Sequence, residues 1–161
     1  MYQAPGYPSV KSLARLVDHN PFYNQHHALL INMTLPSSAP RLRVVDLQKG
    51  KIVFETWVMH GEGSGNVRAT HFSNRQGSNQ TALGRYVVVG QYRGKFGRAY
   101  RLAGLDDTNS NALSRSIVLH SSRYISRGHV GRSKGCPAVS QAALKTMKPY
   151  LQIGTLVWLY R

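Results

Sequence analysis

Apolar residues occur along this chain in short runs that are separated by glycine and other turn residues. Runs of this kind, rich in Val, Ile, Leu and Tyr, are typical of β-strands. They predict strands over residues 28–35, 41–46, 51–59, 84–92, 100–105, 116–120 and 155–160. Many short strands with few helices between them indicate a mainly β domain, built on a mainly antiparallel sheet.

Only two segments carry the apolar spacing of a helix. The first follows Ser9, a residue type that caps helices, and ends before Pro21. The second covers residues 140–148. At 161 residues the chain is long enough for one hydrophobic core. We therefore expect one main domain over residues 28–161, with residues 1–27 forming an irregular lead-in and a short helix packed on that domain.

Two long connections interrupt the strands, at residues 60–83 and 106–115. Loops of this length are uncommon in a compact domain and are often functional. The first is rich in Gly, Ser and Asn and contains His60 and His71. It is therefore the best candidate for a rim that contacts a substrate.

The charge balance is strongly basic, with 21 Lys and Arg against 6 Asp and Glu, which gives a net charge of +15. Such a chain is attracted to polyanions. Its basic residues are scattered and no nucleic-acid-binding motif is present, so we expect diffuse attraction to anionic polymers and no nucleic-acid partner. No apolar stretch reaches the length of a membrane span, and residues 1–8 lack the pattern of a secretion signal. We expect no transmembrane segment, and any export signal to have been removed or never to have existed.

The chemistry that this sequence favours centres on its single cysteine, Cys136. A lone thiol excludes an internal disulfide, and this one lies in a polar loop between Gly135 and Pro137. Glycine gives the backbone freedom to approach a substrate, while Arg132 and Lys134 favour the thiolate form. The proline restricts the turn that presents the sulfur.

A general base is available at His120, which ends an apolar run that is predicted to be a buried strand. The loop of 15 residues between His120 and Cys136 is able to fold back and bring the two side chains together. A third group must orient the imidazole, and Ser121 or Ser122 can do so through a hydroxyl or a backbone carbonyl.

These residues also have less reactive interpretations. A single cysteine is more often a small buried apolar residue, but a polar, glycine-bearing loop is a poor place to bury one. The seven histidines and the cysteine lack the spacing of metal ligands, so neither a metal nor a cofactor is expected. The segment 63–65 lacks the spacing of a serine nucleophile elbow.

The run Val118-Leu119-His120-Ser121-Ser122, followed by Gly131-Arg132-Ser133-Lys134-Gly135-Cys136-Pro137, resembles the signature of the murein L,D-transpeptidase catalytic domain family. These are the YkuD-like cysteine transpeptidases of bacterial cell walls, and the resemblance is to the branch with proline after the cysteine. It extends from about residue 28 to the end of the chain. Further matching segments are Leu30-Ile31-Asn32-Met33, Arg41-Leu42, His60-Gly61, Ser64-Gly65, Phe72-Ser73-Asn74, Gly77-Ser78, Leu83-Gly84, Gly104-Leu105 and Asn111-Ala112.

The resemblance implies a mainly β, YkuD-like catalytic domain with a few short helices, and it implies a role for each residue of the motif. Cys136 is the expected nucleophile and His120 its base, while the Gly135 and Cys136 N–H groups help to form an oxyanion hole. The expected substrate-binding residues are Arg132, Ser133, Lys134 and His60. For His60 the resemblance implies either contact with the substrate or support of the site from behind it, and structural packing is the alternative. A buried structural role is expected for Arg115.

Two positions depart from the family pattern. Many members carry histidine where this chain has Lys134, and arginine where it has Ala138. The first change removes a group that can contact an oxyanion or transfer a proton, and the second removes an anchor for a carboxylate. Donor and acceptor preferences therefore do not carry over from those members.

The activity that the resemblance implies is transpeptidation of peptidoglycan. Tetrapeptide stems would be cleaved through a cysteine thioester, giving 3-3 cross-links or exchange of the terminal D-amino acid. One alternative is a cysteine-dependent peptidoglycan hydrolase, of carboxypeptidase or amidase type. A second is a non-catalytic basic domain that binds wall polymers. The protein is expected in the periplasm or another part of the cell envelope, or secreted, and as a monomer. Its expected partners are stem peptides and anionic envelope polymers. Its expected inhibitors are carbapenems.

Overall fold

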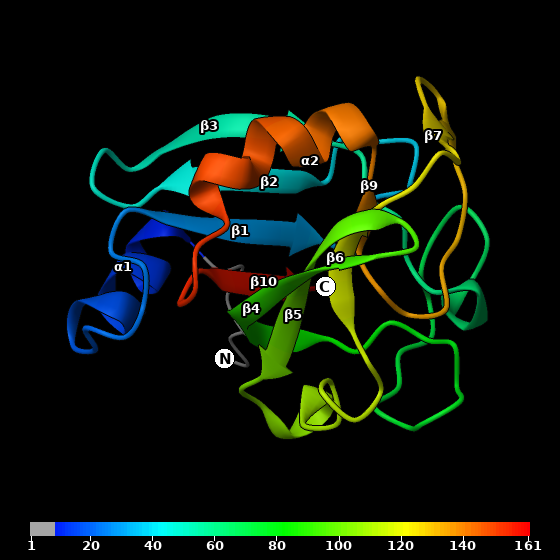
Figure 1. Ribbon diagram of the computed structural model, residues 1–161, viewed down its shortest axis with the longest axis horizontal. Coiled ribbons are helices and arrows are strands. Elements are labelled where there is room, and N and C mark those ends of the chain that lie inside the picture. Colours follow the sequence, from blue (N-terminus) through cyan, green and yellow to red (C-terminus); the bar gives the residue numbers. More distant parts are fainter. Residues whose placement is uncertain (1–8) are drawn as a thin grey trace, which may run out of the picture.

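A computed structural model describes residues 9–161 of the chain. Its centre is an eight-stranded mixed sheet with the strand order β3-β2-β1-β10-β4-β5-β6-β9 (Figure 1). The strands of this sheet are β1 (His27–Asn32), β2 (Leu42–Asp46), β3 (Lys51–Thr56), β4 (Gly84–Gly94), β5 (Gly97–Gly104), β6 (Val118–Ser121), β9 (Ala138–Val139) and β10 (Leu156–Tyr160). A separate two-stranded hairpin is formed by β7 (Ile125–Ser126) and β8 (His129–Val130).

The helical elements are short. They are α1 (Val10–Asp18), α2 (Gln141–Met147) and the single 3-10 turns η1 (Glu62–Ser64), η2 (Asp107–Asn109) and η3 (Lys148–Tyr150). Both α-helices begin where a serine caps them: the Ser9 hydroxyl accepts from the Ser12 N–H, and the Ser140 hydroxyl accepts from the Ala143 N–H. The expected mainly β class with few short helices is therefore confirmed.

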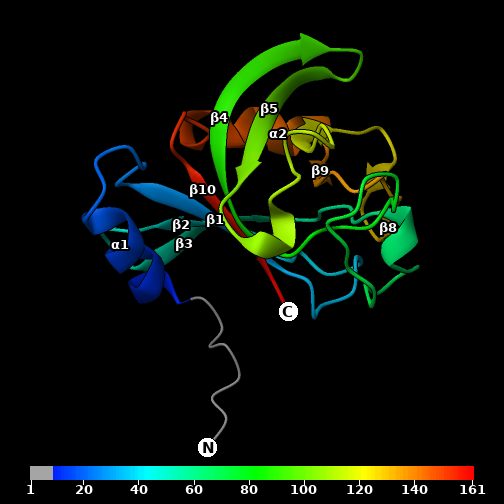
Figure 2. The same cartoon turned by 90° about the horizontal axis from the view of Figure 1, so that it is seen from below.

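The two α-helices cover opposite faces of the sheet, because successive side chains of a strand point to opposite sides (Figure 2). In β1, Leu29 and Ile31 join the core that contains the apolar residues of α2. Ala28 and Leu30 join the second core, which contains Leu13 and Val17 of α1. Helix α1 thus packs directly on the sheet.

All seven strands that the sequence predicts are present, with ends shifted by a few residues. The sheet is less purely antiparallel than expected, because β1 pairs with β10 in parallel and β6 pairs with β9 in parallel. The pattern did not reveal β7, β8 and β9, which have two residues each. The hairpin of β4 and β5 is also longer than predicted, with Lys95 and Phe96 at its tip.

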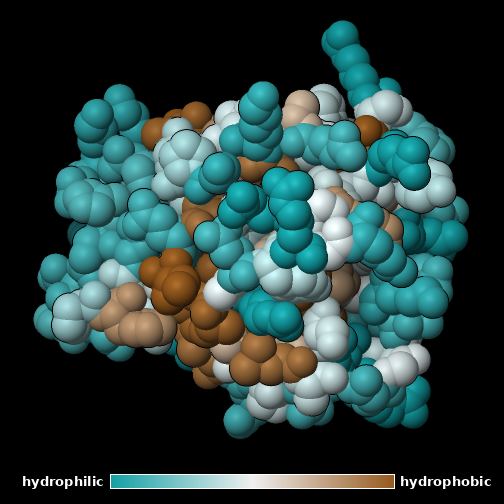
Figure 3. All heavy atoms as spheres, viewed as in Figure 1, coloured by the Kyte–Doolittle hydropathy of each residue, from teal (hydrophilic) through white to brown (hydrophobic). Residues whose placement is uncertain are grey.

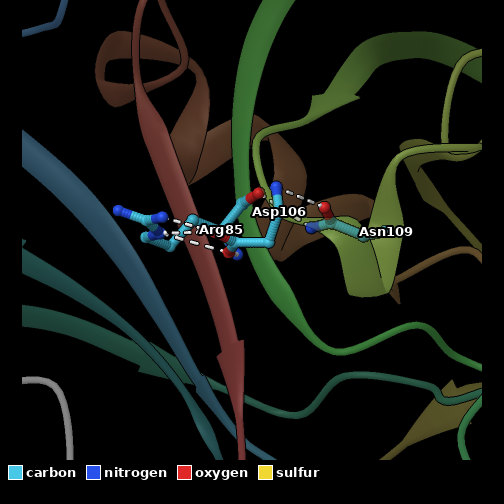
Figure 4. Close-up of polar contacts among 3 residues, drawn as sticks. All are labelled: Arg85, Asp106 and Asn109. Atoms are coloured by element: carbon cyan, nitrogen blue, oxygen red, sulfur yellow. Dashed lines mark hydrogen bonds and ion pairs between the residues drawn. The ribbon is translucent and has the colours of Figure 1, made fainter.

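A polar cluster closes the end of β4 opposite the hairpin tip (Figure 4). The Arg85 guanidinium donates hydrogen bonds to both carboxylate oxygens of Asp106, and these bonds lower the pKa of that carboxyl. Buried Asn109 accepts from the Asp106 N–H at 2.9 Å and donates to the Arg85 carbonyl at 2.8 Å. The cluster ties the loop at residues 106–115, which leads into β6, to the central sheet.

Candidate active site

Strand pairing brings the predicted base and nucleophile into the same region. His120 lies in β6 and pairs in parallel register with Ala138 of β9. The His120 N–H donates to the Pro137 carbonyl over 3.4 Å, one residue beyond Cys136. The turn at residues 133–137 carries the predicted nucleophile and is called the nucleophile turn below. Strand β9 follows this turn directly and therefore holds it beside the histidine.

The orientation of the His120 ring is set by its own strand. Its Nδ1 lies 2.9 Å from the backbone carbonyl oxygen of Ser121. A carbonyl only accepts hydrogen bonds, so Nδ1 carries the proton of the neutral imidazole and Nε2 presents its lone pair. Within residues 9–161 no group is hydrogen-bonded to this Nε2. The ring therefore has the tautomer that a general base requires.

The Cys136 thiol is half-buried and has two backbone neighbours. The Val118 N–H donates to Sγ over 3.4 Å, and the thiol donates to the Ser116 carbonyl over 3.6 Å. Burial raises the pKa of Cys136, while the Val118 N–H and the nearby Arg115 charge act in the opposite direction. In the described part of the chain no hydrogen bond joins Sγ to His120. The resting thiol is thus neutral and directed at the Ser116 carbonyl.

A side chain stabilises the nucleophile turn from within. The Ser133 hydroxyl donates to the Cys136 carbonyl at 2.6 Å and accepts from the Gly135 N–H at 3.1 Å. This geometry differs from the expectation that Ser133 binds substrate and that the Gly135 N–H forms part of the oxyanion hole, because both groups are used inside the turn. The Cys136 N–H has no hydrogen-bond partner within the described residues, so it is the free donor at this turn.

Gly135 is needed here for its conformation. Its φ is +120°, and a Cβ at this position would lie 3.0 Å from the Gln80 carbonyl oxygen and 3.1 Å from Arg115 Nη2. Arg115 donates to the carbonyls of Ser73 and Gln80 and to the Ser78 hydroxyl. This half-buried arginine thus holds the long loop at residues 60–83 against the nucleophile turn.

His60 is buried, with only 1% of its surface exposed. Its Nδ1 lies 2.8 Å from Arg41 Nη2, and its Nε2 lies 3.1 Å from the Gly65 carbonyl oxygen. Arginine only donates, so Nδ1 accepts and the Nε2–H donates. Burial and the adjacent Arg41 charge lower the pKa of His60. The ring therefore offers no free nitrogen to a substrate, which favours the supporting, packed role for His60 over direct substrate contact.

The backbone of His60 explains how this residue acts on the site. Its carbonyl accepts from the Ser133 N–H at 2.9 Å, and the Glu62 N–H donates to the Ser133 carbonyl at 2.7 Å. Gly61 and Ser133 form an isolated parallel bridge. The buried pair of Arg41 and His60 thus supports the segment that leads into the nucleophile turn.

The remaining predicted residues, Arg132 and Lys134, are exposed. Arg132 Nη1 lies 3.5 Å from the Gly65 carbonyl oxygen, and within the described residues the Lys134 ammonium forms no hydrogen bond or ion pair. Both side chains are therefore accessible to an anionic substrate. The half of the molecular face that carries β7 and the neighbouring loops is covered mainly by hydrophilic residues (Figure 3).

Sequence reasoning missed Phe96 at the tip of the β4–β5 hairpin. Its ring stacks on the His120 imidazole, with 5.0 Å between the ring centroids and 20° between the ring planes. One signal was available: a phenylalanine stands between Gly94 and Gly97, where a polar turn residue is usual.

Two further findings concern what the described residues do not contain. Nowhere in residues 9–161 do three His, Cys, Asp or Glu side chains gather in a way that would hold a metal ion. None of the helices in this part of the chain has the length and apolar character needed to cross a membrane.

Comparison with solved structures supports the fold. The chain resembles an L,D-transpeptidase from Mycobacterium tuberculosis (14% identity, TM-score 0.56, covering 84% of this chain and 58% of that one). It also resembles a cysteine-to-serine mutant of an Enterococcus faecium L,D-transpeptidase (11% identity, TM-score 0.55, covering 84% of this chain and 50% of that one). A third similar structure is an LD transpeptidase in complex with imipenem (12% identity, TM-score 0.52, covering 84% of this chain and 59% of that one). This chain therefore spans 50–59% of the length of these proteins.

No curated protein matches the sequence. The sequence model of the L,D-transpeptidase catalytic domain, however, matches residues 8–160, which is nearly the whole chain. With this match and the shared fold, the chain belongs to the L,D-transpeptidase catalytic domain family.

Proposed function

We propose that this protein is a peptidoglycan L,D-transpeptidase that acts through a thioester on Cys136. The observation that carries the proposal is the tautomer of His120: its Nδ1 is held by the Ser121 carbonyl, which leaves Nε2 as a base beside the nucleophile turn. A half-buried thiol with a raised pKa needs such a base at neutral pH.

The first half-reaction begins when the thiol rotates away from the Ser116 carbonyl and gives its proton to His120 Nε2. The sulfur then attacks the carbonyl carbon between the third residue of a stem tetrapeptide and its terminal D-amino acid. The free Cys136 N–H donates to the oxyanion that develops. When the C–N bond breaks, the imidazolium returns its proton to the departing amine, and a thioester remains.

The second half-reaction restores the enzyme. The side-chain amine of the third residue in a neighbouring stem attacks the thioester carbonyl and loses its proton to His120. The C–S bond breaks, the thiolate recovers a proton from the imidazolium, and a cross-link between two third residues is released. If a free D-amino acid attacks instead, the outcome is exchange of the terminal residue.

The charge around the site favours substrates of this class. Exposed Arg132 and Lys134 flank the turn, Lys95 lies next to Phe96 at the hairpin tip, and Arg123 follows the β6 strand end. Stem peptides carry free carboxylates, so these cations raise the rate of encounter and orient the chain of the substrate. Because the substrate lies in the cell wall, we place the protein outside the cytoplasm.

The deciding experiment incubates the protein with purified disaccharide-tetrapeptide and follows the products by mass spectrometry. The wild type should release one D-amino acid for each dimer formed, and the dimer should have the mass of two substrates less that amino acid. The variant Cys136→Ala should form no dimer while keeping the unfolding temperature of the wild type. Trimmed monomers alone would identify a hydrolase, and activity that survives in Cys136→Ala would overturn the proposal.

A second measurement tests the nucleophile without peptidoglycan. A related LD transpeptidase is found in complex with imipenem, and the thiolate proposed here would open the β-lactam ring of the same compound. Intact-mass spectrometry should show the wild type gaining the full mass of imipenem, because the cleaved C–N bond leaves both parts attached. The Cys136→Ala variant should gain none. An adduct on another residue would contradict the assignment.

A further inference from the structure

The tip of the β4–β5 hairpin carries a large apolar side chain in an unusual place. Lys95 and Phe96 form a two-residue turn between Gly94 and Gly97, which pair with each other. The Phe96 side chain is 52% exposed. A phenylalanine that is half exposed contributes little to the core. Its contacts with the rest of the protein are made by the side of the ring that faces inward.

On that side Phe96 has two contacts, and both are with the strand that carries the base. Its ring stacks on the His120 imidazole at 5.0 Å with an interplanar angle of 20°. Its backbone carbonyl accepts a hydrogen bond from the Ser121 hydroxyl at 3.0 Å. Ser121 therefore acts on both partners: its carbonyl holds His120 Nδ1, and its hydroxyl holds the hairpin tip.

We infer that Phe96 is a positioning residue for His120, held in place by the Ser121 hydroxyl. The inference rests on the proposed function, because it assigns His120 as the base. The stacked ring restricts rotation of the imidazole and keeps Nε2 in one direction. When the imidazole accepts the thiol proton it becomes a cation against an aromatic face, and this contact then becomes more favourable. Phe96 thus stabilises the charged state more than the resting one.

The surroundings of the ring are consistent with this role. The Lys95 ammonium lies 4.9 Å from the centroid of the Phe96 ring. The Lys95 and Phe96 side chains are exposed. Salt and water therefore screen the repulsion between the Lys95 ammonium and a protonated His120 imidazole. No Asp or Glu occurs in residues 86–105 or 108–161, so neither the hairpin strands nor the β6 and Cys136 segments supply an acidic side chain to pair with His120. In these segments the Ser121 carbonyl and the Phe96 ring are thus the groups that hold the His120 ring.

The kinetic test compares Phe96→Leu, which keeps apolar volume without an aromatic face, with Phe96→Tyr, which keeps both. Phe96→Leu should lower kcat for dimer formation roughly threefold to thirtyfold, the range that a cation–π contact supplies, with KM changed by less than about twofold. Phe96→Tyr should restore most of the rate. Tyr92→Leu is the matched control, because Tyr92 is an exposed aromatic residue of the same hairpin that contacts Arg101. It should leave kcat unchanged.

A double-mutant cycle tests the clamp, which is the hydrogen bond from the Ser121 hydroxyl to the Phe96 carbonyl. Ser121→Ala removes the hydroxyl that holds the hairpin tip and leaves intact the backbone carbonyl that orients His120. If the two residues act through one contact, Phe96→Leu with Ser121→Ala should lower kcat no more than the worse single variant. Multiplicative losses would overturn the clamp.

A spectroscopic readout separates this inference from the proposed function. In the wild type, the ring current of Phe96 should displace the NMR signals of the His120 ring protons. Phe96→Leu should abolish the displacement and Tyr92→Leu should retain it, whether or not the protein acts on peptidoglycan. If the wild type forms no dimers, the proposed function fails while the stacking contact stands. If the wild type is active and Phe96→Leu matches it in both kcat and NMR signals, the inference is overturned.

Discussion

Arg41 Nη2 lies 2.8 Å from His60 Nδ1, and each of these residues exposes only 1% of its surface. A guanidinium and an imidazole in contact inside a protein are stable only while the imidazole is neutral, because two adjacent buried cations repel each other. Burial also lowers the pKa of Arg41, to about 10. The pair supports the segment that leads to the nucleophile turn, so its ionisation affects the stability of the fold.

The first prediction concerns stability at acidic pH. In the unfolded chain His60 binds a proton below about pH 6.5, whereas in the folded protein its pKa is lower. The unfolded state therefore binds more protons in this range, and folding stability should fall as the pH decreases below about 6.5. Thermal unfolding at pH 5.5 and 7.5 measures the effect.

A pair of variants isolates the contribution of this histidine. His60→Gln removes the titrating group, so the difference in unfolding temperature between the two pH values should shrink, although the variant should be less stable at both. His26→Gln changes an exposed histidine and should leave the difference as in the wild type. Equal pH dependence in wild type and His60→Gln would show that another group is responsible.

The second prediction concerns the reactivity of Cys136. Because burial raises its pKa above the ordinary value of 9.0, alkylation by iodoacetamide should be slow at pH 7 and should reach half its maximal rate only above pH 9. Arg115→Gln removes a charge that lowers this pKa, so the midpoint should move to still higher pH. Arg75→Gln, an exposed change in the loop that Arg115 holds, should leave it unchanged. A midpoint below pH 7 would instead identify a preformed thiolate.

The strands and the two candidate residues, Cys136 and His120, could be picked out because each depends on local sequence. A β-strand with a buried face alternates or concentrates apolar residues, and a reactive thiol needs a polar, glycine-bearing loop. The strand β9 escaped prediction because two residues, Ala138 and Val139, carry no period. It is defined by its pairing with β6, which is a tertiary relationship.

The roles of individual site residues were harder to predict, for the same reason. For His60 the sequence left substrate contact, support of the site and structural packing open, and its contact with Arg41 bridges residues 19 positions apart. Phe96 reaches His120 from a hairpin tip 24 positions earlier in the chain. Residue type indicated what these side chains are able to do, whereas their partners depend on how the strands are arranged.

The third prediction tests the polar cluster that ties the loop before β6 to the sheet. Asn109→Ala leaves the half-buried Asp106 N–H and Arg85 carbonyl without their side-chain partners. The expected loss is about 1–3 kcal/mol in the free energy of unfolding, or roughly 2–10 °C in unfolding temperature. Asp107→Asn changes an exposed carboxylate in the same 3-10 turn and should be neutral within about 0.5 kcal/mol. If Asn109→Ala were as neutral as Asp107→Asn, the cluster would contribute no stability.

The last prediction compares two glycines with positive φ. Gly135 has φ +120°, and an added Cβ would lie 3.0 Å from a backbone carbonyl oxygen; Gly128 has φ +77° with nothing within 4 Å of that position. Both alanine variants carry backbone strain, about 1–2 kcal/mol for Gly128→Ala. Only Gly135→Ala must also displace the loop at Gln80 or the turn itself. Gly135→Ala should therefore lose about 2–4 kcal/mol in its free energy of unfolding. It should also lose most of its acylation by imipenem, because a shift of about 1 Å at a nucleophile lowers the rate about 100-fold. Gly128→Ala, in the β7–β8 turn, should keep the acylation rate of the wild type. If both variants are acylated equally fast, the close packing of Gly135 is not what holds Cys136 in place.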